Sequence, residues 1–137
     1  MASTQKARLQ WKDRRIQQIK KIKMKEFSFI VRVPITYSKD QSQPGNILWN
    51  SLLDKWKAAG IYITSFPFPA EGYVISGPDN SVTKESVLSG NLRLVSNIFL
   101  RAETFEQANE LAKTFPVLPY GGSVEVREIL ARPTAAN

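Results

Sequence analysis

The chain has 137 residues, of which 42% are hydrophobic, 10% aromatic and 23% charged, as in one ordinary globular domain. No apolar run reaches the roughly 20 residues that cross a bilayer, which argues against a transmembrane protein. The sequence contains neither Cys nor His. This excludes disulfides, thiolate and imidazole metal sites, cysteine nucleophiles and His-based triads, so many enzyme classes are excluded and no cofactor is expected.

The net charge of +7 belongs entirely to residues 1–23, which hold eight basic residues against Asp13 alone. Residues 24–137 hold eleven basic and eleven acidic residues. A neutral body lacks the basic face of a dedicated DNA-binding fold, so a nucleic-acid partner is not expected. Residues 1–23 are interpreted as a basic N-terminal extension without a specific function, and electrostatic attachment to nucleic acid or to an anionic surface is the alternative.

The extension carries apolar residues at roughly helical spacing, namely Leu9, Ile16, Ile19 and Ile22, so a basic helix with a narrow apolar stripe is one interpretation. No apolar run follows the charges, so the segment does not resemble a secretory signal. The folded pattern begins at Met24, which makes Met24 an alternative start of translation.

The first strand of the body is predicted over Phe27–Val33, because Phe27, Phe29, Val31 and Val33 alternate with Ser28, Ile30 and Arg32. Residues 34–46 have the composition of a loop, with two prolines and a glycine. A helix is predicted over 47–59, because apolar residues recur at 48, 52, 56 and 59 and Gly60 follows as a stop.

The second half predicts a strand at 61–66, a short strand at 73–75 and a turn at 77–80. Residues 81–91 show no clear pattern, and 92–102 reads as a long strand. Thr104 and Gln107 have the spacing of a capping box at the start of a helix, which must end near Phe115 because Pro116 follows. A final strand spans 123–130 after Gly121-Gly122, where a turn with positive φ is the expected reason for the glycines.

This order of elements predicts an α+β fold of the ferredoxin-like, split βαβ type. An antiparallel sheet of four or five strands carries both helices on one face. The other face, which includes Ile30, then lacks a cover. A second copy of the chain would supply one, so a homodimer is expected.

Two stretches, Ala102–Ala112 and Phe115–Ile129, resemble the carboxy-terminal signature of the YCII-related, or DGPF-domain, family. Met24–Ile30, the helix containing Trp56 and Glu71–Val74 are similar to the first half of that family. The resemblance covers about residues 24–130 and implies a subunit that pairs into a dimeric α/β barrel. The YCII-like domain is therefore predicted over residues 24–132, and residues 133–137, which begin at Pro133, are interpreted as a frayed end.

The chain departs from this family in two places. Relatives with an activity act on small organic molecules in a cavity between sheet and helices with a His and Asp pair, and this chain has no His. The Asp of the family's Val-Thr-Asp-Gly-Pro stretch falls on Lys84, and its Gly-Pro falls on Glu85-Ser86. A site built on those positions therefore does not transfer, and the chain is not expected to be an enzyme.

The candidate ligand-binding residues are Arg32, Ser65, Glu125 and Arg127. Alternation places Glu125 and Arg127 on the side away from the helices, with Arg32, where a guanidinium can hold a small carboxylate or phosphate. The alternative is that these Arg and Glu side chains satisfy each other across an interface. Ser65, at the end of a strand, is a polar anchor with nothing nearby to activate it as a nucleophile.

Aromatic residues gather in the first half of the chain and either line an apolar pocket or form the core; they are Trp49, Trp56, Tyr62, Phe66, Phe68 and Tyr73. The first hypothesis is therefore a cytoplasmic, homodimeric YCII-like protein. It binds a small molecule or a partner in the cavity between subunits, without catalysis. An enzyme that uses Arg32, Glu125 and Arg127 for binding and proton transfer is the second hypothesis, and a nucleic-acid accessory protein is the third.

Overall fold

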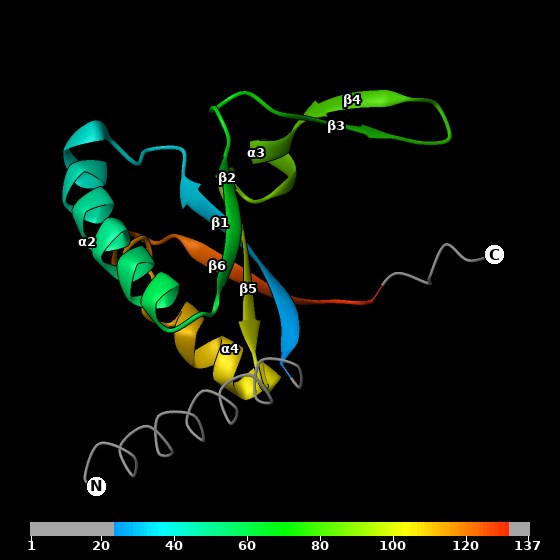
Figure 1. Ribbon diagram of the computed structural model, residues 1–137. Helices are drawn as coiled ribbons and strands as arrows, with labels where there is room; N and C mark the ends of the chain where they lie inside the picture. The colour runs from blue at the N-terminus through cyan, green and yellow to red at the C-terminus, as the bar shows by residue number, and fades with distance from the viewer. Residues whose placement is uncertain (1–23, 132–137) are drawn as a thin grey trace, which may run out of the picture.

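The computed structural model describes residues 24–131 of the chain (Figure 1). The basic extension at 1–23 and the C-terminal residues 132–137 lie outside the described residues, so the predictions made for them are not addressed by the structure. The described part begins with β1 and ends just after β6.

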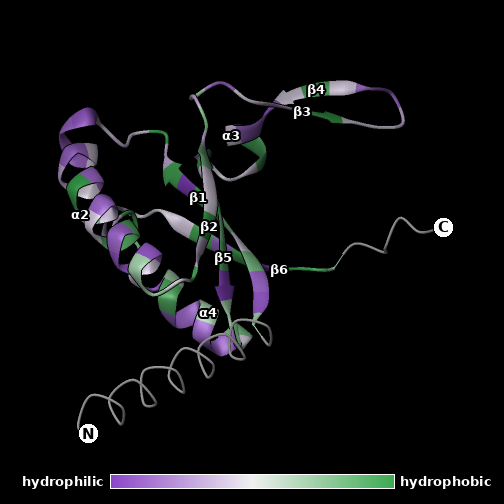
Figure 2. Ribbon diagram, in the orientation of Figure 1, coloured by the Kyte–Doolittle hydropathy of each residue, from purple (hydrophilic) through white to green (hydrophobic). Residues whose placement is uncertain are grey.

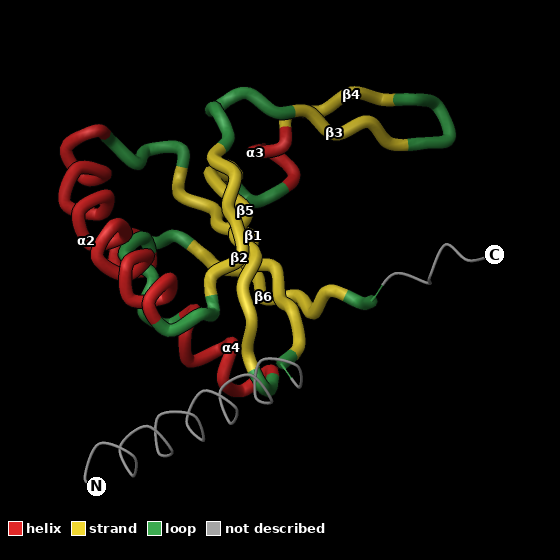
Figure 3. The backbone as a smooth tube through the Cα atoms, in the orientation of Figure 1, coloured by secondary structure: helices red, strands yellow, loops and turns green. Residues whose placement is uncertain are grey.

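The main sheet has four antiparallel strands in the order β2-β5-β1-β6 (Figures 1 and 3). The two central strands are β1 (Lys25–Pro34) and β5 (Leu92–Ala102), and the edges are β2 (Tyr62–Pro67) and β6 (Ser123–Ile129). The helices α2 and α4 lie on one side of this sheet (Figure 1). The α+β class and the ferredoxin-like order are confirmed, and pairing into a barrel stays a prediction.

The alternation of β1 sets the two faces of the sheet. Phe27, Phe29, Val31 and Val33 are each at most 1% exposed and form the core, with Ile98 and Leu100 opposite them on β5. Because successive side chains point to opposite faces, Ser28, Ile30 and Arg32 lie on the other face. We call this second side the open face.

The first helix is longer than the sequence predicted. α2 spans Lys39–Ala58, so residues 39–46 are helical and the interpretation of 34–46 as a loop is wrong beyond residue 38. Ser38 and Gln41 form a complete capping box at the start, which satisfies free backbone N–H groups and starts the helix despite Pro44 in its second turn. The expected stop is confirmed by the positive φ of 73° at Gly60.

The second helix, α4 (Phe105–Ala112), begins as the sequence predicted. The Gln107 backbone N–H donates to the Thr104 hydroxyl at 3.1 Å, and the Glu103 N–H donates to the Gln107 side chain. Ala108 and Ala112 are its buried residues, so this short helix packs closely on the core. A 3-10 turn, η1 (Leu118–Tyr120), leads to Gly121, whose φ of 87° confirms the expected left-handed turn before β6.

The segment between β2 and β5 forms a separate hairpin of β3 (Tyr73–Ser76) and β4 (Ser81–Lys84), followed by the short helix α3 (Glu85–Leu88). The turn at 77–80 is confirmed, but the strand at 73–75 belongs to this hairpin and not to the main sheet. Figure 1 shows the hairpin projecting to the side away from α2 and α4, and Figure 2 shows hydrophobic segments along it.

Candidate functional site

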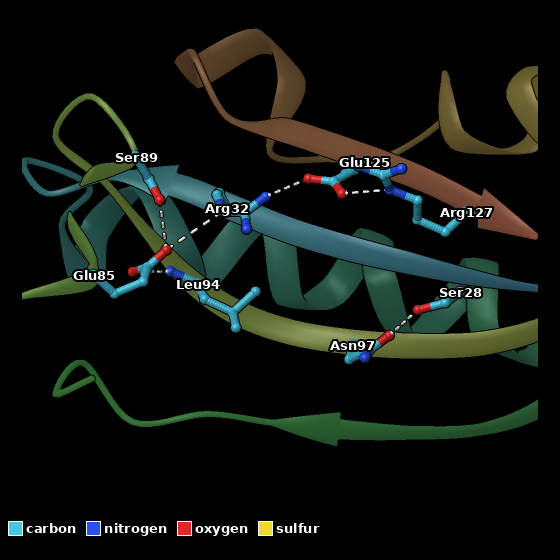
Figure 4. Close-up of polar contacts among 8 residues, drawn as sticks. All are labelled: Ser28, Arg32, Glu85, Ser89, Leu94, Asn97, Glu125 and Arg127. Atoms are coloured by element: carbon cyan, nitrogen blue, oxygen red, sulfur yellow. Dashed lines mark hydrogen bonds and ion pairs between the residues drawn. The ribbon is translucent and has the colours of Figure 1, made fainter. Parts of the chain in front are cut away.

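The open face brings three of the four predicted site residues together. Arg32 Nη1 lies 2.9 Å from Glu125 Oε1, and Arg127 Nε lies 2.7 Å from Glu125 Oε2 (Figure 4). The strand register explains the cluster, because Ile30 of β1 opposes Glu125 of β6 and Ser28 opposes Arg127. Residues that are directly opposite share a face of the sheet, as the alternation predicted.

A fourth member, Glu85 at the start of α3, was not predicted from the sequence. Its Oε1 lies 3.3 Å from Arg32 Nε and accepts a hydrogen bond from Ser89 Oγ at 2.9 Å. Its Oε2 accepts from the Leu94 backbone N–H at 3.1 Å (Figure 4). Glu85 lies in the segment without a clear pattern, so no periodicity signalled this contact. We call Arg32, Glu85, Glu125 and Arg127 the ion-pair cluster.

The ion-pair cluster has no net charge, because it holds two guanidinium groups and two carboxylates. Each of these groups is paired with another member of the cluster. Hydrogen bonds from Arg127 and then Arg32 lower the pKa of Glu125 against the opposing effect of burial. A general acid or base near neutral pH needs a carboxyl pKa shifted upward, so this shift disfavours the proton-transfer role. The arrangement favours the alternative in which these Arg and Glu side chains satisfy each other.

Ser65 lies apart from the ion-pair cluster. It opposes Ile98 of β5, a core residue, so it belongs to the helix side of the sheet. Its hydroxyl lies 2.7 Å from the hydroxyl of Tyr62, and the two form a local hydrogen bond. The structure therefore does not join Ser65 to Arg32, Glu125 and Arg127 in one site.

A cavity of about 380 Å³ lies on the helix side, between the first half of α2 and the sheet. It is lined by the ends of β1, β2 and β5, by the first half of α2 and by the loop after α4. The lining residues used below are Val31, Val33, Tyr37, Lys39, Ser42, Gly45, Trp49, Phe68, Arg93, Ile98 and Phe115. No Asp or Glu of the described chain is among the residues that line it.

One wall of the cavity is aromatic. The rings of Trp49 and Phe115 stack with centroids 5.3 Å apart, and Trp56 packs behind both of them in the core. The aromatic residues in the first half of the chain therefore have different roles. Trp49 and Phe68 line the cavity, whereas Trp56 belongs to the core and is only 3% exposed. Phe66 and Tyr73 do neither and are each 53% exposed.

Tyr37 lies at the cavity and remains protonated at neutral pH. Burial and the neighbouring Tyr120 raise its pKa, and the positive charge of Arg93 opposes this only in part. The hydroxyl donates to the Gln41 backbone carbonyl at 3.3 Å. Gly45 allows the close approach of α2 here, because a Cβ on Gly45 would lie 3.0 Å from the Tyr37 hydroxyl oxygen.

A second hollow, of about 500 Å³, lies between α4 and β6 and carries no aromatic ring on its lining. Exposed Glu106, Glu110 and Lys113 border it, and the rest of its lining is mostly aliphatic. Within residues 24–131, no three Asp or Glu side chains gather where they would hold a metal ion. Across the same residues, no helix has both the length and the hydropathy of a membrane span.

Comparison with known proteins leaves the family open. None of the protein-family models matches the chain, and neither does any curated protein sequence. A solved structure with some likeness is the GlnK–ATP complex of B. subtilis, with 17% identity and a TM-score of 0.36. The match covers 78% of this chain and 83% of that one. A likeness at that score carries no argument about function, and membership of the YCII-related family stays a prediction.

Proposed function

We propose that the protein binds a small organic molecule with an aromatic body in the cavity between α2 and the sheet. The observation that carries this proposal is the cavity itself, whose volume of about 380 Å³ falls in the range of ligand pockets. Its walls combine stacked aromatic rings with a few polar groups, which is the usual make-up of a small-molecule site. The proposed site lies within one subunit, whereas the sequence predicted a cavity between subunits.

The proposal assigns binding and no chemical step. The two carboxylates of the ion-pair cluster are each held by an arginine, and the chain has no His or Cys to act as base or nucleophile. The lining residues are mostly apolar and contain no described carboxylate. These features favour ligand binding over catalysis.

The test uses the full chain with a neutral probe, naphthalen-2-ylmethanol, followed by NMR. We expect chemical-shift changes at Trp49, Ile98 and Phe115, because these residues line the cavity. Ser42→Trp should block the cavity and abolish the changes. Ser51→Trp is the matched control, since Ser51 is exposed on the same helix and does not line the cavity. Shifts that avoid the cavity residues, or that survive Ser42→Trp, would reject the site.

We also propose, as a separate property, that two copies of the chain pair through the open face. Phe66 is 53% exposed and packs edge-to-face on Phe99 at 6.1 Å, and Ile30 lies partly buried on the same face. Exposed aromatic rings on a sheet face favour a partner, and a symmetric pair supplies one. On the same face the Ser28 hydroxyl donates to the Asn97 side-chain oxygen, so these two atoms already have a hydrogen-bond partner when a second copy covers them.

Light scattering after size exclusion tests the pairing. We expect a dimer at micromolar concentration and a monomer for Phe66→Asp, which places a charge in the apolar part of the face. Tyr73→Asp is the control, because Tyr73 is equally exposed but lies on the hairpin. A monomeric wild-type chain would overturn the pairing and would leave the cavity proposal standing.

A further inference from the structure

The cavity between α2 and the sheet carries a charge that the described chain does not balance. Arg93 and Lys39 line it, whereas no described Asp or Glu does. Arg93 lies near the start of β5 opposite Val33 and is only partly exposed. A partly exposed guanidinium that shares a cavity with aromatic rings gains from a carboxylate partner, because the carboxylate matches its planar fork of donors.

Arg93 also lacks a partner among residues 24–131. Its guanidinium has no ion pair and no hydrogen bond there, whereas Arg32 and Arg127 are both bonded to carboxylates. Tyr37, which lines the same cavity, is a neutral phenol whose hydroxyl already donates to the Gln41 backbone carbonyl. It therefore does not neutralise Arg93.

The rest of the cavity lining is largely apolar. Trp49 and Phe115 present stacked rings, and Val33 and Ile98 of the core form the floor. An occupant that complements both the aromatic rings and the guanidinium carries a flat apolar body and a single negative group. A neutral apolar molecule would leave Arg93 unpaired, and a cation would be repelled by it.

On this basis we propose that the ligand is a small aromatic carboxylate, with its carboxylate on the Arg93 guanidinium and its ring against Trp49 and Phe115. The inference rests on the proposed function, since it names the class of molecule that the same cavity takes. Arg93 supplies the preference for an anion, and the aromatic wall supplies most of the binding.

The experiment compares three probes of similar shape by calorimetry on the full chain: 2-naphthoate, naphthalen-2-ylmethanol and 2-naphthylmethylammonium. We expect the carboxylate to bind about tenfold more tightly than the alcohol, and the ammonium to bind most weakly. Arg93→Gln should remove most of the difference between carboxylate and alcohol while the alcohol still binds, because the other lining cation, Lys39, is exposed to solvent. Arg93→Lys should retain part of it, because the charge stays and the planar fork is lost.

Arg101→Gln is the matched control. Arg101 lies on the same strand and is also partly exposed, but it opposes Glu26 on the open face. Its loss should leave the tenfold preference intact. Equal binding of carboxylate and alcohol to the wild type, or a preference that survives Arg93→Gln, would overturn the role of Arg93 and leave the cavity proposal intact. Failure of all three probes to bind would reject the proposed function itself.

Discussion

Glu85 holds the short helix α3 against the sheet, and its removal tests how the open face is stabilised. The carboxylate accepts hydrogen bonds from Ser89 and from the Leu94 backbone and pairs with Arg32. α3 has only four residues and no side-chain cap at its start, so it has little stability of its own. Glu85→Ala removes all three contacts at once.

The expected cost follows from what each partner loses. The Leu94 N–H loses its acceptor in a partly buried position, and Arg32 loses one of its two carboxylates. The side chains of Arg32 and Glu85 are 23% and 19% exposed, so solvent screens part of their attraction. We therefore expect a loss of about 2–3 kcal/mol in the free energy of unfolding. For a domain of this size, that loss lowers the Tm by roughly 8–12 °C.

Urea denaturation followed by circular dichroism measures the global loss, and hydrogen exchange locates it. Exchange should rise first in residues 85–94. Glu85→Gln should cost about half as much, because its amide oxygen still accepts from the Leu94 N–H while the charge is lost. Glu71→Ala is the control, since Glu71 is exposed and lies just before the hairpin; it should change stability by less than about 0.5 kcal/mol. A Glu85→Ala cost below about 0.5 kcal/mol, with unchanged exchange at 85–94, would refute the reasoning.

Substitutions in the core, at a crowded glycine and at Glu125 test the packing and the charges. Phe29→Ala should lower the free energy of unfolding, measured by urea denaturation, by about 3–5 kcal/mol, because removal of a fully buried ring leaves a cavity. Ile30→Ala on the open face should lower it clearly less. Equal losses would contradict the assignment of the two faces. Gly122→Ala should destabilise the fold by about 1–3 kcal/mol, because the added Cβ would lie 2.8 Å from the backbone carbonyl oxygen of Arg32. The control is Gly72→Ala, whose Cβ would meet nothing closer than 3.8 Å, so its stability in the same assay should be unchanged. The pKa of Glu125 is lowered in the folded state, so this carboxylate stabilises the fold above its unfolded pKa and loses that contribution as the pH falls through the folded pKa. Glu125→Gln should therefore lose less stability than the wild type between pH 5 and pH 3, about the range of the unfolded Glu pKa. Parallel curves of unfolding free energy against pH for the two proteins would argue against a lowered pKa.

Local patterns in the sequence determined the strands, the helix caps and the two faces of the sheet. The alternation of β1 placed Phe29 in the core and Arg32 on the opposite face. Thr104 and Gln107 marked the start of α4 at the correct residue. These features depend on neighbours within a few positions, because a period of two or a capping spacing is fixed by backbone geometry alone.

The loop predicted from composition at residues 34–46 is wrong beyond residue 38, because packing against the rest of the fold decides the structure there. Pro44 and Gly45 are typical of a loop, yet they lie inside α2, because the cap at Ser38 starts the helix earlier and Gly45 is buried against Tyr37. Glycine destabilises a helix by itself, but it is tolerated inside α2 because the helix and the Tyr37 side chain must approach each other closely at Gly45.

The sequence thus determined which side chains share the open face, and three members of the ion-pair cluster followed from that. Only the tertiary structure decided that Glu85 joins them, 53 residues along the chain from Arg32. It alone also formed the cavity, in which Arg93 of β5 meets Trp49 of α2 and Phe115 of a loop. Contacts between such distant segments depend on how the helices sit on the sheet, and no local pattern encodes that position.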